Sequence, residues 1–369
     1  MEPATALPTP VYARYRDNLP RHLLGLSTYL QTRMMHLLQQ DYGHTDLRLS
    51  FAPYITLAGE KDLRVSQVAE LLGISRQACN QAAQLVERAG YLERLDDPDD
   101  GRAKILRLTS AGQSLRRDGV TAVRKLDTEF ATVAGAAETA AASRALGQIY
   151  SALRLSDIPE QGTQDYDAMG GLLPRLADYI LLRLMELTRA KGHDGLKISF
   201  GQVLPFIGAS GGSIQQIANL HQVSKQAISA IANELEELGY LCREPHPTDA
   251  RQLLLQFTPR GRQLIADSVR STEELEAEFQ AIVGKRAMTT VGRVLRHLYL
   301  TLQPEHGAML ETAQTQMPPR TSEVTDLRLL AGQLRQQLGE QRCLELAALL
   351  NDSFSSHETS TRRPGGNST

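Results

Sequence analysis

The sequence predicts a mainly α-helical fold with small β-hairpins, in which one structural plan occurs twice. Three observations lead to this prediction. When the chain of 369 residues is shifted by 149 positions, two long segments align without a gap. Trp is absent and aromatic residues make up only 5%, which disfavours a β-sandwich and suits a helical protein. In each copy, two short helical segments are followed by two short extended stretches.

The internal repeat holds its register over most of the chain. Phe51 aligns with Phe200, and Tyr91 aligns with Tyr240. Further identical pairs are Ala69 and Ala218, Ser75 and Ser224, Gln77 and Gln226, Thr109 and Thr258, and Gly112 and Gly261. We therefore predict two domains, a helical extension and a disordered tail, at 11–158, 165–303, 320–351 and 352–369.

The elements of the first copy follow from capping residues, periodicity and turn residues. We expect a long helix from Asn18 to Gln40, a helix from Ser50, and a short helix with Ser66 as its N-cap. Another helix begins at Ser75 and ends at Gly90, two extended stretches flank an Asp/Pro/Gly-rich turn, and two helices close the copy. Their ranges are 91–95, 104–108, 110–133 and 138–155.

The helix that begins at Ser75 has an apolar face and a polar face. Cys79, Ala82, Val86 and Ala89 share the apolar face, which we expect to pack on the domain. Polar side chains at its outer face and start could contact phosphates and base edges, although any exposed helix can carry such residues. These candidates are Ser75, Arg76, Gln77, Asn80, Gln81 and Gln84, with Ser224, Lys225, Gln226, Ser229 and Asn233 in the second copy.

The hairpin that follows supplies further candidates for contact with nucleic acid. Arg102 and Arg251 are predicted at the two hairpin tips, each two residues after an Asp that can orient the guanidinium group. An ordered Arg on a narrow ribbon can enter a minor groove. Lys104 follows the first tip. Two short helices and a hairpin form the winged helix-turn-helix plan.

Together these motifs resemble the MarR (multiple antibiotic resistance regulator) family of transcription regulators. The resemblance rests on the recognition-helix pattern, the Gly-Tyr-Leu turn, the Asp/Pro/Arg wing and the Leu-x-Leu-Thr-x-x-Gly exit at 106–112. It implies double-stranded DNA as the partner and a repressor. Family dimers interlock through their terminal helices, so the tandem copies imply a pseudo-two-fold dimer within one chain. The alternative is that two chains pair copy to copy. The copies differ at Gln81, where the second has Ala230, so we expect an imperfect palindrome as the site.

The resemblance also implies a small aromatic ligand between the dimer helices and the DNA-binding lobe, or a sensing cysteine. The ligand candidates are Tyr29, Arg33, His36, His44, Tyr54, Tyr179, His193 and Phe206, each of which is alternatively an ordinary core or interface residue. Cys79 occupies a core position, which favours a structural thiol. Cys242 lies beside the second hairpin without an evident partner, and Cys343 lies outside both copies.

Several other classes of protein are disfavoured. The sequence has no nucleophile elbow, phosphate loop or metal-ligand spacing, so we expect no enzyme, cofactor or metal. It has no run of about 18 apolar residues, which a membrane span requires. The few Cys residues and a start without a signal-peptide pattern predict a cytoplasmic protein. The net charge of −2 leaves open a regulator that binds ligand or protein and binds DNA weakly or not at all. The C-terminal helices could add an oligomerisation surface.

Overall fold

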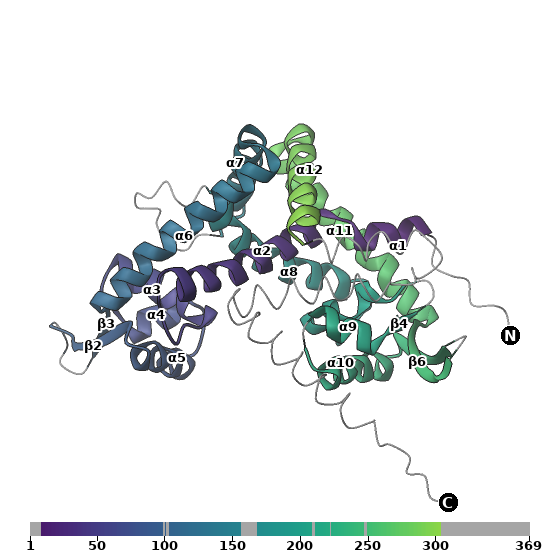
Figure 1. Cartoon of the computed structure of the whole chain (residues 1–369), viewed down its shortest axis with the longest axis horizontal. Helices are drawn as coiled ribbons and strands as arrows, with labels where there is room; N and C mark the ends of the chain where they lie inside the picture. Colours follow the sequence, from purple (N-terminus) through teal and green to yellow (C-terminus); the bar gives the residue numbers. More distant parts are fainter. Residues whose placement is uncertain are drawn as a thin grey trace, which may run out of the picture. The chain divides into compact units, whose positions relative to one another are not determined.

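Figure 1 shows the computed structural model of the chain. It describes residues 9–98, 100, 103–155, 168–208, 211–221, 223–246 and 249–303. Residues 1–313 form one compact unit, and residues 314–369 form a second. The predicted C-terminal helices and tail, and the predicted linker between the copies, lie outside the described residues.

Among its described residues, the first copy contains seven α-helices and one three-stranded sheet. In chain order they are α1 (Thr9–Arg16), α2 (Leu19–His36), α3 (Ala52–Glu60), β1 (Leu63–Arg64), α4 (Val65–Leu71), α5 (Arg76–Arg88), β2 (Leu92–Asp96), β3 (Lys104–Leu108), α6 (Ser110–Ala134) and α7 (Ala136–Ala152). The second copy repeats the plan as α8 (Met169–Arg189), β4 (Gly212–Ser213), α9 (Ile214–His221), α10 (Lys225–Glu237), β5 (Leu241–His246), β6 (Asp249–Phe257), α11 (Pro259–Val283) and α12 (Lys285–Leu302). This arrangement confirms the predicted fold class.

Three of the long helices, α2, α6 and α11, begin at side chains that accept hydrogen bonds from their first backbone N–H groups. The Oδ1 of Asn18 accepts a hydrogen bond from the backbone N–H of Arg21 at 2.9 Å, and Pro20 occupies the first turn of α2. Thr109 and Thr258 cap α6 and α11 in the same way, through bonds of 3.1 and 3.0 Å from Gly112 and Gly261. Equivalent caps in both copies explain why the repeated sequence starts its helices at equivalent positions.

In each copy, the short helices and a small antiparallel sheet form a compact part, which we call its lobe. The sheet has a two-residue edge strand. The strand orders are β1-β3-β2 and β4-β6-β5. In the first sheet Leu92 pairs with Leu108, and Leu63 pairs with Leu106. The hairpins agree with the predicted extended stretches, whereas the two edge strands were not predicted, because a pair of residues carries no readable alternation.

Two local predictions were wrong. The short helix α4 begins after Arg64, whose backbone N–H donates to the Oε1 of Gln67 at 2.9 Å, so Ser66 lies inside the helix and is not its N-cap. In the second copy, the repeat predicts a helix from Ser199 as the counterpart of α3, but this segment is not an α-helix. It consists of two 3₁₀ turns, Ile198–Gln202 and Leu204–Phe206, because Pro205 has no N–H for an α-helical hydrogen bond and its ring opposes the preceding turn.

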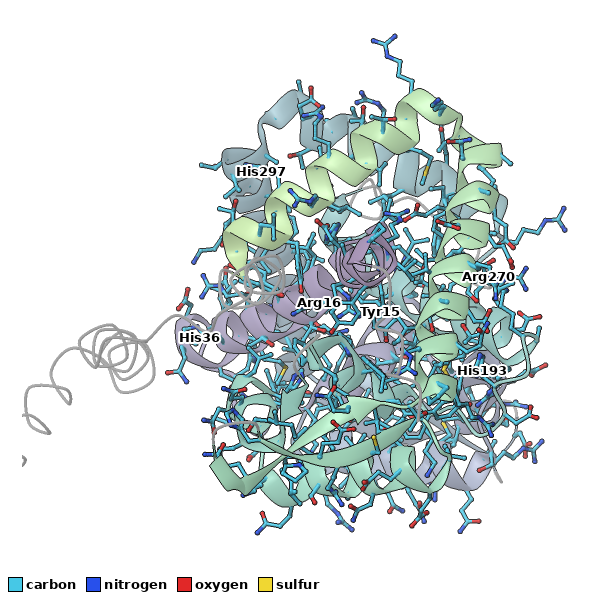
Figure 2. The ribbon with its side chains drawn as sticks, turned by 90° about the vertical axis from the view of Figure 1, so that its right-hand side faces the viewer. Tyr15, Arg16, His36, His193, Arg270 and His297 are labelled. Carbon is cyan, nitrogen blue, oxygen red and sulfur yellow. The ribbon has the colours of Figure 1, made fainter. Side chains whose placement is uncertain are left out.

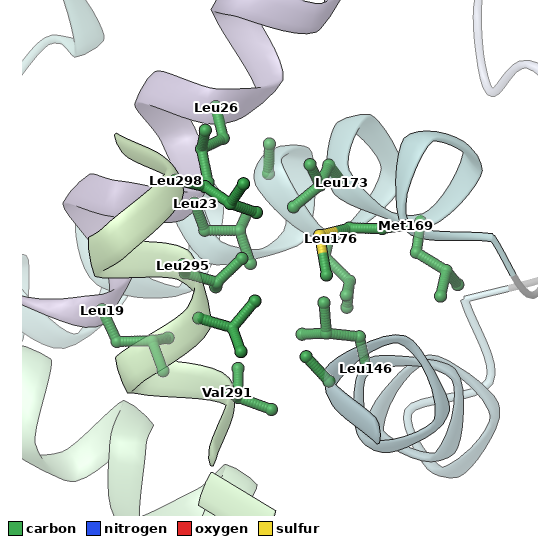
Figure 3. Close-up of a cluster of buried hydrophobic side chains, with 14 of the residues drawn as sticks. Leu19, Leu23, Leu26, Leu146, Met169, Leu173, Leu176, Val291, Leu295 and Leu298 are labelled. Carbon is green, nitrogen blue, oxygen red and sulfur yellow. The ribbon is translucent and has the colours of Figure 1, made fainter. Parts of the chain in front are cut away.

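The two copies are joined by a hydrophobic core made from their long helices. Helix α2 packs against α8 and α12, and α7 packs against α12 and α8. The buried side chains come from both copies, as Figure 3 shows for Leu23, Leu26, Leu173 and Leu295. Leu23, Leu173 and Leu295 are fully buried, so separating the copies would expose a continuous apolar surface to water. The pseudo-two-fold dimer is therefore built within one chain.

Each lobe also has a hydrophobic core of its own, and the second one includes a residue from the first copy. Tyr12 of α1 joins the cluster that contains Phe200, Leu235 and Leu255. Helix α1 packs along α11, which Figure 1 also shows. The N-terminal helix of the first copy thus completes the core of the second lobe.

Gly112 lies where the first turn of α6 meets the chain at the end of α5. A Cβ atom at this position would overlap the backbone carbonyl oxygen of Tyr91, and Gly261 stands in the same relation to Tyr240. We expect Gly112→Ala to destabilise the protein by about 1–3 kcal/mol, because backbone rather than a flexible side chain must move. Urea unfolding followed by circular dichroism measures this change.

Gly119 provides the matched control on the same helix. A Cβ atom there would meet no atom within 4 Å, and its backbone is helical. Gly119→Ala should therefore stabilise α6 by about 0.5–1 kcal/mol. Equal unfolding midpoints for the two variants would contradict this account of Gly112.

Candidate nucleic-acid interface

The first helix-turn-helix consists of α4 and α5 with a tight turn between them. Gly73 in the turn has a φ of +62°, which glycine adopts without strain. The backbone N–H of Ile74 donates to the carbonyl oxygen of Ala69 at 3.0 Å and closes the turn. Ser75 caps α5 by accepting a hydrogen bond from the backbone N–H of Ala78 at 3.1 Å. Ser75 therefore holds the start of α5, as the sequence predicts.

Helix α5 separates buried and exposed side chains by its helical period. Cys79, Ala83 and Val86 are fully buried in the first lobe, whereas Ala82 and Ala89 are half-buried beside them. Four candidate contact residues are exposed on the opposite side, namely Arg76, Gln77, Gln81 and Gln84. Their amide and guanidinium groups are free to meet an external partner along one helix face.

Asn80 differs from the other candidates because it binds a residue of the hairpin. The Nη1 of Arg94 on β2 donates to the Oδ1 of Asn80 at 2.7 Å, and its Nε donates to Glu87 at 2.8 Å. Asn80 is half-buried. Its acceptor oxygen is occupied in this arrangement, which leaves its amide nitrogen for a partner. Arg94 thereby ties the hairpin to the helix that precedes it.

The second helix-turn-helix consists of α9 and α10 and repeats this design with different side chains. Ser224 caps α10 through a 3.2 Å bond from the backbone N–H of Ala227. Lys225, Gln226 and Asn233 are exposed, and Ser229 is half-buried. Arg243 of β5 donates to the Oδ1 of Asn233 at 2.6 Å and pairs with Glu236 at 2.7 Å.

The hairpins flank the helices as wings. In the first wing, Lys104 pairs with Asp96 across the two strands, and the nearly buried Asp97 accepts from the Nε of Arg64 at the start of α4. Ser213 and His246 occupy the positions of Arg64 and Asp97 in the second copy, so that Arg–carboxylate pair is absent there by composition. Arg102 lies outside the described residues. Arg251 lies in β6, where only its backbone is described.

Figure 1 shows α5 and α10 on the same side of the unit formed by residues 1–313, with the hairpins toward its outer flanks. The interlocked helices α7 and α12 lie on the opposite side. Two helices that each carry exposed polar side chains therefore lie on one side of this unit. This placement follows from the pairing of the long helices and not from either lobe alone.

Sequence reasoning missed the residues that join wing and helix, which are Arg94, Arg243 and Arg64. A signal was present for two of them. Arg94 and Arg243 are equivalent in the 149-residue register, as are their partners Glu87 and Glu236. A repeated Arg–Glu pair seven residues apart indicates a shared contact. Arg64 has no repeated counterpart and could only be assigned from the structure.

The ligand candidates of the first copy lie in several separate places. The Oη of Tyr29 donates to the Oε1 of Glu129 at 2.6 Å, and Arg33 lies 3.9 Å from the other oxygen of this carboxylate. Desolvation, and then the bond to Glu129, raise the pKa of Tyr29 to about 12. His44 pairs with Asp118 at 2.8 Å, and Tyr54 is buried in the lobe core. His36 is exposed.

The candidates of the second copy are also separate from one another. His193 is buried between Asp267, at 2.9 Å, and the hydroxyl of Tyr240, at 3.2 Å. Tyr179 stacks on Phe279, and Phe206 meets the ring of His221 edge-on. Figure 2 shows His36 and His193 at opposite sides of the view. Of all the ligand candidates, Tyr29 and Arg33 are brought together at Glu129, but the eight residues do not line one cleft. The role of these residues in ligand binding stays a prediction.

The two cysteines within the described residues are free thiols. Cys79 is fully buried and Cys242 is half-buried. Burial raises the pKa of both thiols. Since the thiolate is the reactive form, this shift disfavours oxidation at either position.

The fold and this surface define a winged helix-turn-helix protein with two recognition helices. Comparison with known proteins agrees, because residues 55–103 and 195–252 match the sequence model of the MarR family. Two regions of the chain, one in each copy, are thus similar to the MarR family.

Two further comparisons concern individual proteins. The chain is 28% identical over 100 residues to the "Putative transcriptional regulatory protein for hcr operon" of Thauera aromatica. That match covers 27% of this chain and spans 60% of the relative's length. The chain is also similar to the crystal structure of a transcriptional regulator from Thermotoga maritima. The match covers 38% of this chain and 94% of the regulator's chain, with 20% sequence identity and a TM-score of 0.27.

The described residues also bear on membranes and metals. None of their helices combines the length and apolar character needed to cross a bilayer. Within the same residues, no group of three or more His, Cys, Asp or Glu side chains is arranged to hold a metal ion.

Proposed function

We propose that this chain is a DNA-binding transcription regulator, acting as a repressor in the cytoplasm, whose two recognition helices and two wings contact one duplex. The observation that carries the proposal is the pair of exposed polar faces on α5 and α10, presented on one side of the unit. A homodimeric winged helix obtains this arrangement from two chains. Here the helices of one chain produce it.

The proposed contacts differ between the two helices. Arg76, Gln77, Gln81 and Gln84 offer donors and acceptors to base edges from α5. In α10 the position of Gln81 is Ala230, which offers only a methyl group. We therefore propose an imperfect palindrome with half-site centres about 10–10.5 base pairs apart, or a multiple of that spacing. A response to a small aromatic ligand is a further part of the proposal.

The wings give the direct test of this function. Arg102→Ala and Arg251→Ala should each weaken DNA binding and lower the slope of log affinity against log salt by about one for each phosphate group that the variant no longer binds. The measurement is fluorescence anisotropy of the full chain, titrated into labelled DNA at several salt concentrations. Thermal unfolding of each variant establishes that the fold is retained.

Arg144→Ala is the matched control for the removal of one positive charge. Arg144 is exposed on α7, on the side of the unit away from α5 and α10, so this substitution should leave the salt slope unchanged. Salt-independent or undetectable DNA binding by the unaltered chain would refute the proposal. That result would favour a regulator that acts through ligand or protein contacts.

A further inference from the structure

A basic groove lies on the first lobe, away from the recognition helix α5. The groove has a volume of about 800 Å³ and is formed by the end of α3, the loop before β1, strand β3 and the first half of α6. Its volume falls within the range of about 300–1,000 Å³ typical of sites for small molecules. None of its lining residues belongs to α5.

The lining of the groove is strongly basic. Five of the lining residues carry positive charge and two carry negative charge, and these are Lys61, Arg107, Arg116, Arg117 and Arg124, with Glu60 and Asp62. Arg107 is already paired, since its Nε donates to both oxygens of Asp62 at 3.0 and 3.1 Å. The groove thus retains an excess of positive charge after its acids are counted.

Arg116 and Arg117 provide the available guanidinium groups. Among the described residues, neither side chain takes part in a hydrogen bond or ion pair. Arg116 is half-buried and lies across Gly59, where a Cβ atom would collide with its stem. Gly59 therefore lets this side chain lie flat on α3 at the edge of the groove. A guanidinium group in such a position is suited to bidentate contact with an oxyanion.

The second copy shows that the fold does not require this charge. The positions of Arg107, Arg116 and Arg117 are held there by Gln256, Ile265 and Ala266, and the position of Arg124 is held by Glu273. Strand β6 and helix α11 repeat β3 and α6 in the second copy without these side chains, so the arginines are an addition to the first lobe. Their concentration in one concave surface calls for an anionic occupant.

We propose that this groove binds a small polyanion, a metabolite with at least two negative charges carried by phosphoryl or carboxylate groups. A single carboxylate carries one negative charge, which is less than the excess of positive charge among the lining residues. The apolar side chains of Leu108 and Val120 at the groove surface can contact the organic part of such a ligand. The site exists in the first lobe alone, so one chain binds one ligand.

The test is isothermal titration calorimetry of the full chain with four probes, namely pyrophosphate, citrate, orthophosphate and benzoate. We expect saturable binding of pyrophosphate or citrate at one site per chain, weaker binding of orthophosphate, and no binding of benzoate. The ratio of the first two affinities identifies phosphoryl or carboxylate as the preferred group. Absence of saturable binding by both polyanions, or benzoate binding of equal strength, would overturn the proposal.

Variants locate the site. Arg116→Gln/Arg117→Gln should lower polyanion affinity by at least about tenfold, because two charge-assisted contacts are removed. Lys285→Gln/Arg286→Gln removes the same charge from exposed positions at the start of α12 and should leave the affinity unchanged. If the first pair does not fold, Arg117→Gln alone, at an exposed position, should show a smaller decrease. Equal affinities for all variants would overturn the assignment. A second outcome would also overturn it. If the unaltered chain binds no polyanion and the Arg116/Arg117 variant binds DNA more weakly, the groove contacts the DNA backbone instead.

Discussion

Replacing Gln77, Gln81 and Gln84 together by Ala is expected to remove most of the sequence specificity of DNA binding. The three amides are exposed on one face of α5, and each good bidentate contact to a base contributes about 1–3 kcal/mol of discrimination. Affinity for a selected site should therefore fall toward the value for unrelated DNA, which typical regulators bind about 10³–10⁷-fold more weakly. The salt slope should change little, because the phosphate contacts remain.

The second copy offers a matched variant at the same three positions. Ala230 already corresponds to Gln81, so Gln226→Ala/Asn233→Ala leaves Ala at all three positions of α10, as the triple variant does in α5. We expect this variant to keep more of its specificity, since the Oδ1 of Asn233 already accepts a hydrogen bond from Arg243. Sites are selected from random DNA with the unaltered chain, and both variants are then measured on the selected site.

Base changes in each half of the selected site complete this test. Changes in the half bound by α5 should cost more than matching changes in the half bound by α10. Two identical and equally constrained half-sites would show that the differences between α5 and α10 have no effect on recognition.

Tyr12→Ala is expected to destabilise the second lobe by about 3–5 kcal/mol, the range for removing a large buried aromatic side chain. Tyr12 belongs to the first copy but is buried in the core of the second, where its ring meets Phe257 edge-on at 6.3 Å between centroids. The guanidinium of Arg16 lies 5.4 Å from the ring centroid. The hydrophobic cluster around Tyr12 otherwise consists of buried residues of the second copy, so the effect should be confined to that lobe.

Tyr12→Phe should have the opposite effect. The hydroxyl of Tyr12 is buried and has no hydrogen-bond partner among the described residues, and burial raises its pKa to about 12. An unsatisfied buried polar group costs about 1–3 kcal/mol, so its removal should raise stability while the ring contacts are kept.

Hydrogen exchange measured by mass spectrometry distinguishes the two lobes in these variants. In Tyr12→Ala, exchange should accelerate in α9 and α10 and stay unchanged in α4 and α5. Calorimetric unfolding should place Tyr12→Phe at or above the unaltered chain. Uniform acceleration in both lobes would mean that α1 acts on the common helical core and not on the second lobe.

The sequence by itself determined the features that depend on short separations along the chain. The 149-residue register established two copies. The start of a helix at Ser75 is also predictable, because a capping side chain acts within three residues. The polar face of α5 followed from the helical period, and Arg76, Gln77, Gln81 and Gln84 are exposed as that period predicts. The hairpins followed from extended stretches around turn residues.

The tertiary structure decided the features that depend on contacts between distant segments. Arg94 reaches Asn80 and Glu87 only once β2 folds back on α5, so no local pattern revealed that Asn80 has an occupied acceptor. Arg116 and Gly59 form one groove although a short strand, two helices and a hairpin separate them in sequence. Helix α1 has few residues and a weak apolar pattern, and its place on the second lobe comes from burial of Tyr12 among side chains about two hundred residues away. Periodicity reports which face of an element is apolar, whereas the partner of that face is chosen by the packing of the whole chain.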